Sequence, residues 1–261
     1  MNLAMQTYAK NHNKNDTSNM RILSFSNASH GNSIATLSVS DAAVNTNNYP
    51  TYNWPRANLP KMIYPFSPNS DANLAKEEEC LASVRTIVEQ SREDNADVAG
   101  IIIEPISAFE NRQATPMFYK HLRALCQAEG IPLIVDETRV GMGITGKMWA
   151  HEHWYLSERD GGAPDIVTFG GRAGISGVYH SKNVVSGEAD QNVNMVDVLN
   201  YGVTWRTIQD NVLLDWVQDT SSFFKIELGN IERDMGIISN VRGNGTFLGF
   251  DTPDARSCNL I

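Results

Sequence analysis

The chain of 261 residues has only three cysteines, no long apolar run and no cluster of basic residues. Cys80, Cys126 and Cys258 lie far apart without disulfide or metal-site spacing, so we expect reduced, structural thiols. No run approaches the roughly 20 apolar residues of a membrane span, and residues 1–8 lack the features of a signal peptide. The net charge of −9, without runs of Lys and Arg, argues against nucleic acid as the main partner. We therefore expect a soluble, intracellular chain.

Two short apolar segments that end in carboxylates predict buried strands. Residues 98–105 and 131–137 are apolar almost throughout until Glu104 and Asp136, which is typical of strands covered on both faces in a parallel sheet. Between them, Thr115 and Pro116 suit a helix start, and apolar residues follow at helical spacing. This strand, helix, strand order predicts an α/β fold with a mostly parallel sheet flanked by helices.

Other segments extend this pattern along the chain. Helical spacing marks residues 1–11, 74–92 and 210–231, whereas residues 21–25 and 165–169 suit strands and residues 241–250 suit a turn that leads into a strand. Residues 41–68 are rich in Asn, Pro and aromatic side chains, which predicts an ordered excursion over the surface rather than a flexible linker.

Several motifs carry a family resemblance. They are Ile102-Ile-Glu-Pro105, Val135-Asp-Glu137, Thr145-Gly-Lys-Met-Trp-Ala-His-Glu-His-Trp154, Pro164-Asp-Ile-Val-Thr-Phe169 and Val241-Arg-Gly-Asn-Gly-Thr-Phe247. On these motifs the chain resembles the class III, fold-type I aminotransferases that use pyridoxal phosphate, most closely those of the 4-aminobutyrate type. The resemblance implies that residues 1–235 form the large, cofactor-type domain and that residues 236–261 begin an incomplete small domain.

The same resemblance reveals departures at the site. The family's Schiff-base lysine aligns with Gly171, so neither the covalent link nor the proton carrier is expected from this position. The aromatic residue that stacks on the cofactor aligns with Ser29, the arginine that grips the substrate with Asn32, and a glutamine near the phenolic oxygen with Arg139. The family's Gln-Ser-Glu is replaced by residues 107–109, which end in Phe109.

Relative to the family, the chain also starts after the phosphate-binding loop and ends before much of the small domain. We therefore expect both parts of the site to be missing. The resemblance retains Asp136 for the pyridinium nitrogen and Thr204 for the cofactor phosphate of a partner subunit. We expect both positions to be vestigial and unoccupied, with the ancestral pyridoxal phosphate lost.

Each singled-out residue also has a purely structural interpretation. Asp136 is either a vestigial cofactor contact or a hydrogen-bonded carboxylate at a strand end, and we expect Arg139 or Arg172 to neutralise its charge. Phe109 either contacts a new ligand or, as we prefer, fills space left by the cofactor.

The histidines and the nearest lysines have structural interpretations as well. We expect His30, His151 and His153 to form structural hydrogen bonds rather than a metal site. Lys147 and Lys182 are the lysines nearest to the lost position in the sequence, and we expect neither to replace the missing amine.

These inferences favour a catalytically inactive pseudoenzyme that serves as a structural or interaction subunit of a larger, mitochondrial complex, although a cytoplasmic location stays open. Its partner would be a homologous chain, a second copy or unrelated subunits. The alternative is a working 4-aminobutyrate-type transaminase whose site is completed by a partner chain. A third possibility is a small-molecule sensor that uses the old cleft.

Overall fold

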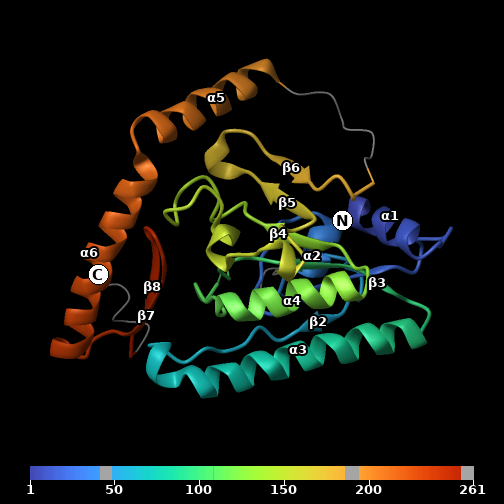
Figure 1. The fold of residues 1–261 in the computed structure, drawn as a ribbon, viewed down its shortest axis with the longest axis horizontal. Helices are drawn as coiled ribbons and strands as arrows, with labels where there is room; N and C mark the ends of the chain where they lie inside the picture. The colour runs from blue at the N-terminus through green and yellow to red at the C-terminus, as the bar shows by residue number, and fades with distance from the viewer. Residues whose placement is uncertain (42–48, 108, 186–193, 254–261) are drawn as a thin grey trace.

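A six-stranded sheet in the order β2-β1-β3-β4-β5-β6 forms the centre of the computed structural model (Figure 1). The structure describes residues 1–41, 49–107, 109–185 and 194–253. The strands are β1 (Arg21–Phe25), β2 (Arg56–Ala57), β3 (Val98–Ile103), β4 (Leu133–Asp136), β5 (Ile166–Phe169) and β6 (Gly177–His180). All neighbouring strands are parallel except β5 and β6, which confirms the predicted α/β sheet.

Alternate residues of the central strands enter two separate hydrophobic clusters. Ile101, Ile103 and Leu133 lie in the cluster that includes α3 (Ser70–Glu93) and α4 (Pro116–Ala128). Ile102 and Ile134 lie in the other cluster, with residues from α1 (Asn2–Asn11) and α2 (Ile34–Val39). The strands are therefore buried on both faces, which is why their sequences are continuously apolar rather than alternating.

Helix α4 starts at the position predicted from Thr115 and Pro116. Thr115 caps the helix by accepting a hydrogen bond from the N–H of Phe118 at 3.4 Å. The buried carboxylate of Glu77 on α3 accepts from the N–H of Thr115 at 2.7 Å and from its hydroxyl at 2.9 Å. These bonds join the two helices that cover one face of the sheet, and they satisfy donors that a helix start leaves open.

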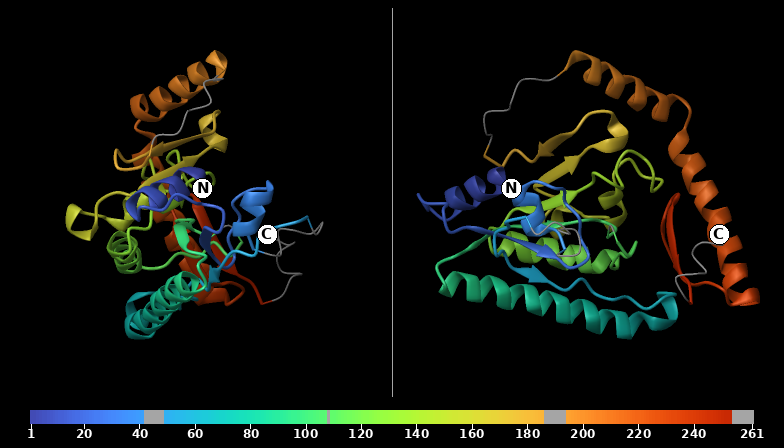
Figure 2. Two further views of the ribbon diagram at one scale, coloured as in Figure 1. Left: turned by 90° about the vertical axis from the view of Figure 1, so that its right-hand side faces the viewer. Right: turned by 180° about the vertical axis from the view of Figure 1, so that it is seen from behind.

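The last part of the described chain extends beyond the sheet. Helices α5 (Met195–Asp210) and α6 (Leu213–Met235) precede a hairpin of β7 (Ser239–Asn244) and β8 (Phe247–Asp251). In Figures 1 and 2, α5 lies beyond β6, and α6 runs alongside the hairpin. Helix α6 starts three residues later than predicted because Val212 adopts a left-handed conformation with φ of 52°.

Two further expectations concern cysteines and membrane spans. Cys80 and Cys126 are buried and unpaired as predicted, and burial raises the pKa of each thiol to about 12. Cys258 lies outside the described residues. Across the described ranges, no helix combines the length and apolar character needed to cross a bilayer.

Candidate functional site

The candidate site lies where the parallel strands end. Asp136 is the last residue of β4 and pairs in register with Thr168 of β5, while Glu104 directly follows β3. His30 comes from the connection between β1 and α2. Ligands of α/β sheets bind at this carboxyl edge, because the loops that follow the strands gather there.

Asp136 sits in a dense set of hydrogen bonds. Its Oδ2 lies 2.7 Å from Nδ1 of His30, and its Oδ1 accepts from the N–H of Thr138 at 3.0 Å, from the Thr138 hydroxyl at 2.6 Å and from the Thr168 hydroxyl at 3.1 Å. Burial opposes ionisation of Asp136, but the hydrogen bond and charge of His30 and the two hydrogen bonds from Thr138 outweigh burial and lower the pKa of Asp136. The carboxylate is thus held ionised in a nearly dry setting.

His30 is the closest partner of this carboxylate. Its side chain is 1% exposed, and Nδ1 faces Asp136 while Nε2 is buried without a hydrogen-bond partner among the described residues. Because the ionised carboxylate accepts, the Nδ1 atom carries the proton of this bond. The hydrogen bond expected of His30 is confirmed.

The predicted partners of Asp136 are wrong. Arg139 and Arg172 are exposed, and the Arg172 guanidinium donates to the backbone carbonyl of Arg139 rather than to the carboxylate. No ion pair joins either arginine to Asp136 in the described parts of the chain. Sequence spacing suggested a cation nearby, but the fold places His30 in contact from a residue 106 positions away.

The two histidines of the Trp-Ala-His-Glu-His-Trp segment form hydrogen bonds, as predicted. Glu137, whose side chain is fully buried, accepts from the N–H of Ala150 at 3.0 Å, from the N–H of His151 at 2.8 Å and pairs with His151 Nδ1 at 2.8 Å. His153 bonds to the carbonyl of Thr145 at 3.0 Å. Among the described residues, no group of His, Cys, Asp and Glu side chains could hold a metal ion.

Gly171 occupies a turn that suits glycine. Its φ is +60°, and a Cβ added there would lie 3.3 Å from the carbonyl oxygen of Thr138. An L-residue at this position is strained by its backbone conformation, and the neighbouring backbone is close. The turn η5 (Gly171–Ala173) thus places a residue without a side chain beside Thr138, which donates hydrogen bonds to Asp136.

The residues fit one end of pyridoxal phosphate and not the other. A buried carboxylate that stays ionised suits the protonated ring nitrogen, and Asp136 meets this requirement through His30 and Thr138. Position 171 supplies no amine for the aldehyde end, because glycine has no side chain.

The other expected site residues are dispersed. Thr204 is half-buried on α5, which packs against η5. Lys182 follows β6 at the opposite edge of the sheet, and Lys147 lies beside Gly146, whose carbonyl accepts from Gln218 at 2.7 Å. Phe109 is 51% exposed, so the prediction that it fills the cofactor space is wrong, and Ala108 lies outside the described residues.

Two hydrogen-bond partners of Asp136, Thr138 and Thr168, were not predicted from the sequence. Thr138 follows it by two residues, a spacing at which a carboxylate often binds the local backbone and hydroxyl. Thr168 could be found only from the strand register, which sets it beside Asp136.

Two curated relatives and one solved structure illustrate what the chain is similar to. A 4-aminobutyrate aminotransferase from Dictyostelium discoideum is 38% identical over 242 residues, which cover 90% of this chain and 48% of the relative. A mitochondrial 4-aminobutyrate aminotransferase from Homo sapiens is 32% identical over 247 residues, with 89% and 47% covered. The chain spans about half the length of these relatives.

Among solved structures, a lysine aminotransferase from M. tuberculosis in the internal aldimine form superposes with a TM-score of 0.80. It shares 24% sequence identity, and the match covers 96% of this chain and 58% of that one. At this identity the match supports the fold alone, and it confirms the predicted mostly parallel sheet flanked by helices.

These relatives overturn three predictions: that the chain is a pseudoenzyme, that it is not an enzyme, and that the cofactor is lost. The relatives are named as aminotransferases, and none of these names indicates an inactive branch or one without pyridoxal phosphate. Glycine at position 171 removes an amine, but it does not remove the buried carboxylate of Asp136, whose pKa is lowered.

A match to a family model extends over almost the whole chain. The family model described as aminotransferase class III matches residues 1–260. That range includes both strands that end in carboxylates, the turn at Gly171 and the β7–β8 hairpin. The chain therefore belongs to the class III aminotransferases.

Proposed function

We propose that this chain forms part of a pyridoxal phosphate-dependent aminotransferase of the 4-aminobutyrate type, with a site that a partner chain completes. The observation that carries this proposal is the buried, ionised Asp136 with its His30 partner at the carboxyl edge of the sheet. Relatives named as 4-aminobutyrate aminotransferases support the substrate class.

Asp136 would hold the ring nitrogen of the cofactor. When bound, pyridoxal phosphate supplies an electron sink for the substrate carbon next to the amine. The negative charge of the Asp136 carboxylate would favour the protonated form of the ring nitrogen. His30 and the two threonines keep that charge in place by donating to the carboxylate, so they are positioning residues.

The amine that Gly171 lacks would come from the partner chain. Helices α5 and α6 offer a docking surface for such a chain, because large apolar side chains are exposed along both. We define this surface by Met195, Val196, Leu199, Val203, Trp216, Phe223 and Ile226. Thr204 lies on α5 within the same region and would reach the phosphate of the partner's cofactor. The partner is then a homologous chain, because a second copy would carry the same glycine at position 171.

Domain organisation and location extend the proposal. Residues 1–235 would be the large domain, and the β7–β8 hairpin would begin the small domain assigned to residues 236–261. A mitochondrial location is supported by the naming of mammalian relatives as mitochondrial.

The proposal is tested on the chain isolated at gentle ionic strength together with its bound partners. We expect a visible cofactor absorbance, fixation of the cofactor to a lysine of the partner by borohydride, and amine transfer from 4-aminobutyrate to an oxo acid. The Asp136→Ala variant should lose the transfer, whereas the exposed-surface variant Lys61→Gln should keep it. A partner-bound complex that neither binds the cofactor nor transfers the amine would contradict the proposal.

A further inference from the structure

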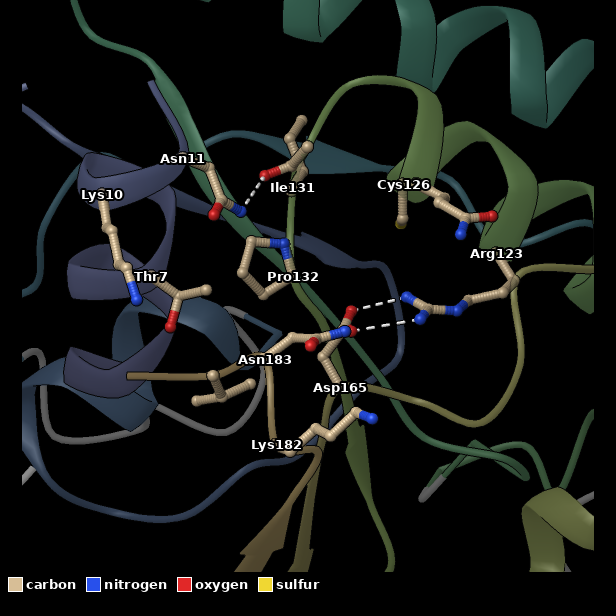
Figure 3. Close-up of a pocket in the computed structure, with 13 residues that line it drawn as sticks. Thr7, Lys10, Asn11, Arg123, Cys126, Ile131, Pro132, Asp165, Lys182 and Asn183 are labelled. Atoms are coloured by element: carbon tan, nitrogen blue, oxygen red, sulfur yellow. Dashed lines mark hydrogen bonds and ion pairs between the residues drawn. The ribbon is translucent and has the colours of Figure 1, made fainter. Parts of the chain in front are cut away.

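A polar cavity of about 490 Å³ lies at the edge of the sheet opposite to Asp136. Figure 3 shows the residues that line it. Its lining comes from α1, from the end of α4, from the residues that precede β4 and β5, and from the turn after β6. The amino-terminal ends of the parallel strands therefore border this cavity, whereas Asp136 and His30 lie at their carboxyl ends. The cavity is separate from the proposed aminotransferase site.

Positive charge dominates the lining. Lys10, Arg123 and Lys182 face a single acidic residue, Asp165, in a chain whose net charge is −9. Lys10 extends from α1 on one side of the cavity, while Arg123 and Asp165 lie on the other, with Lys182 on the turn after β6 (Figure 3). Such a local excess of cations runs against the overall charge and attracts anions.

The one acid is already neutralised. Arg123 donates to both oxygens of Asp165, at 2.5 Å and 3.1 Å, and the N–H of Leu133 donates to the same carboxylate at 2.9 Å. Lys10 and Lys182 form no ion pair within residues 1–41, 49–107, 109–185 and 194–253. Two full positive charges thus remain without an acidic partner in the described chain.

Arg123 adds a buried donor. Its side chain is only 8% exposed, and it uses Nε for the carbonyl of Gly161 at 3.1 Å and one N–H of each Nη for Asp165. A guanidinium has five N–H groups, so two of them have no partner among these bonds. The bonds to Gly161 and Asp165 hold the guanidinium in the lining of the cavity, together with the two lysines.

We infer that this cavity binds a small phosphate-bearing molecule. The guanidinium of Arg123 already binds the carboxylate of Asp165 through two nitrogens. The other cations are the ammonium groups of Lys10 and Lys182, and an ammonium group binds phosphate as a point charge. Two separated lysines favour a ligand with more than one negative charge. The phosphate group is either that of inorganic pyrophosphate or that of an organic phosphomonoester.

Calorimetric titration of the full chain at constant ionic strength tests the inference, with pyrophosphate, glycerol 3-phosphate and acetate as probes. We expect a phosphate probe to bind and acetate not to bind. Lys10→Gln and Lys182→Gln should each weaken binding about tenfold, because each removes a charge-assisted hydrogen bond. Both lysines are exposed, so the variants should fold, and Lys61→Gln serves as the matched control.

The two probes separate the two sources of phosphate. Tighter binding of pyrophosphate points to an inorganic ligand, and tighter binding of glycerol 3-phosphate points to an organic one. Absence of binding by both probes, or unchanged affinity in the Lys10→Gln, Lys182→Gln double variant, would overturn the inference. Activity at the Asp136 edge does not enter this readout.

Discussion

Nδ1 of His30 lies 2.7 Å from the Asp136 carboxylate, and both side chains are almost fully buried. The bond ties the segment after β1 to the end of β4, across the intervening strand β3. An ionised carboxylate at this depth requires such a partner, because an uncompensated buried charge is strongly destabilising. The pair therefore supports the fold and also sets the charge at the proposed site.

Replacement of His30 by Ala should lower the free energy of unfolding by about 3 kcal/mol, because it leaves the Asp136 charge buried with fewer donors. Urea denaturation followed by circular dichroism measures the change. His180→Ala, at an exposed histidine on β6, is the matched control and should stay within about 0.5 kcal/mol of the parent. Equal stability of the two variants would show that the pair contributes little.

Stability should depend on pH through Asp136. Its pKa in the folded chain lies below the ordinary value of 3.8, so its contribution is complete above that value and is lost as the pH falls through the folded pKa. Acid titration of unfolding should show this loss in the parent and a smaller one in Asp136→Asn. Identical acid limbs for both proteins would refute the assignment.

Gly171→Lys should restore an amine beside the site. Because φ is +60° at this residue, we expect a cost of roughly 1–2 kcal/mol in stability. Addition of pyridoxal phosphate should then produce a visible absorbance that borohydride fixes onto residue 171. Gly171→Ala carries the same strain without the amine and should give no such signal, which separates chemistry from destabilisation.

The exposed apolar surface on α5 and α6 should matter for association and not for folding. Trp216 is 67% exposed, so Trp216→Glu should change stability by less than about 0.5 kcal/mol. Binding of the partner should weaken tenfold or more, since aromatic side chains dominate interface energies. Native mass spectrometry or sedimentation measures the association. Met117→Glu, on the exposed side of α4, should leave it unchanged.

The sequence was sufficient for the elements whose pattern is local. The continuous apolar runs at residues 98–103 and 133–136, and the cap at Thr115, predicted β3, β4 and the start of α4 within a few residues. By contrast, α2, α5, β2 and β6 were not predicted. Helix α5 has exposed apolar residues such as Met195, Leu199 and Val203 rather than a single buried stripe, so periodicity gave no signal.

The sequence by itself determined the family, the parallel sheet and the presence of a carboxylate at the end of β4, because these follow from motifs and from local periodicity. Only the tertiary structure decided which groups meet that carboxylate. His30 and Thr168 reach Asp136 through strand order and register, which bring residues together over 106 and 32 positions, and the nearby arginines turn elsewhere. The cationic cavity around Arg123 likewise exists because α1, α4 and the turn after β6 converge, and no local pattern encodes that convergence.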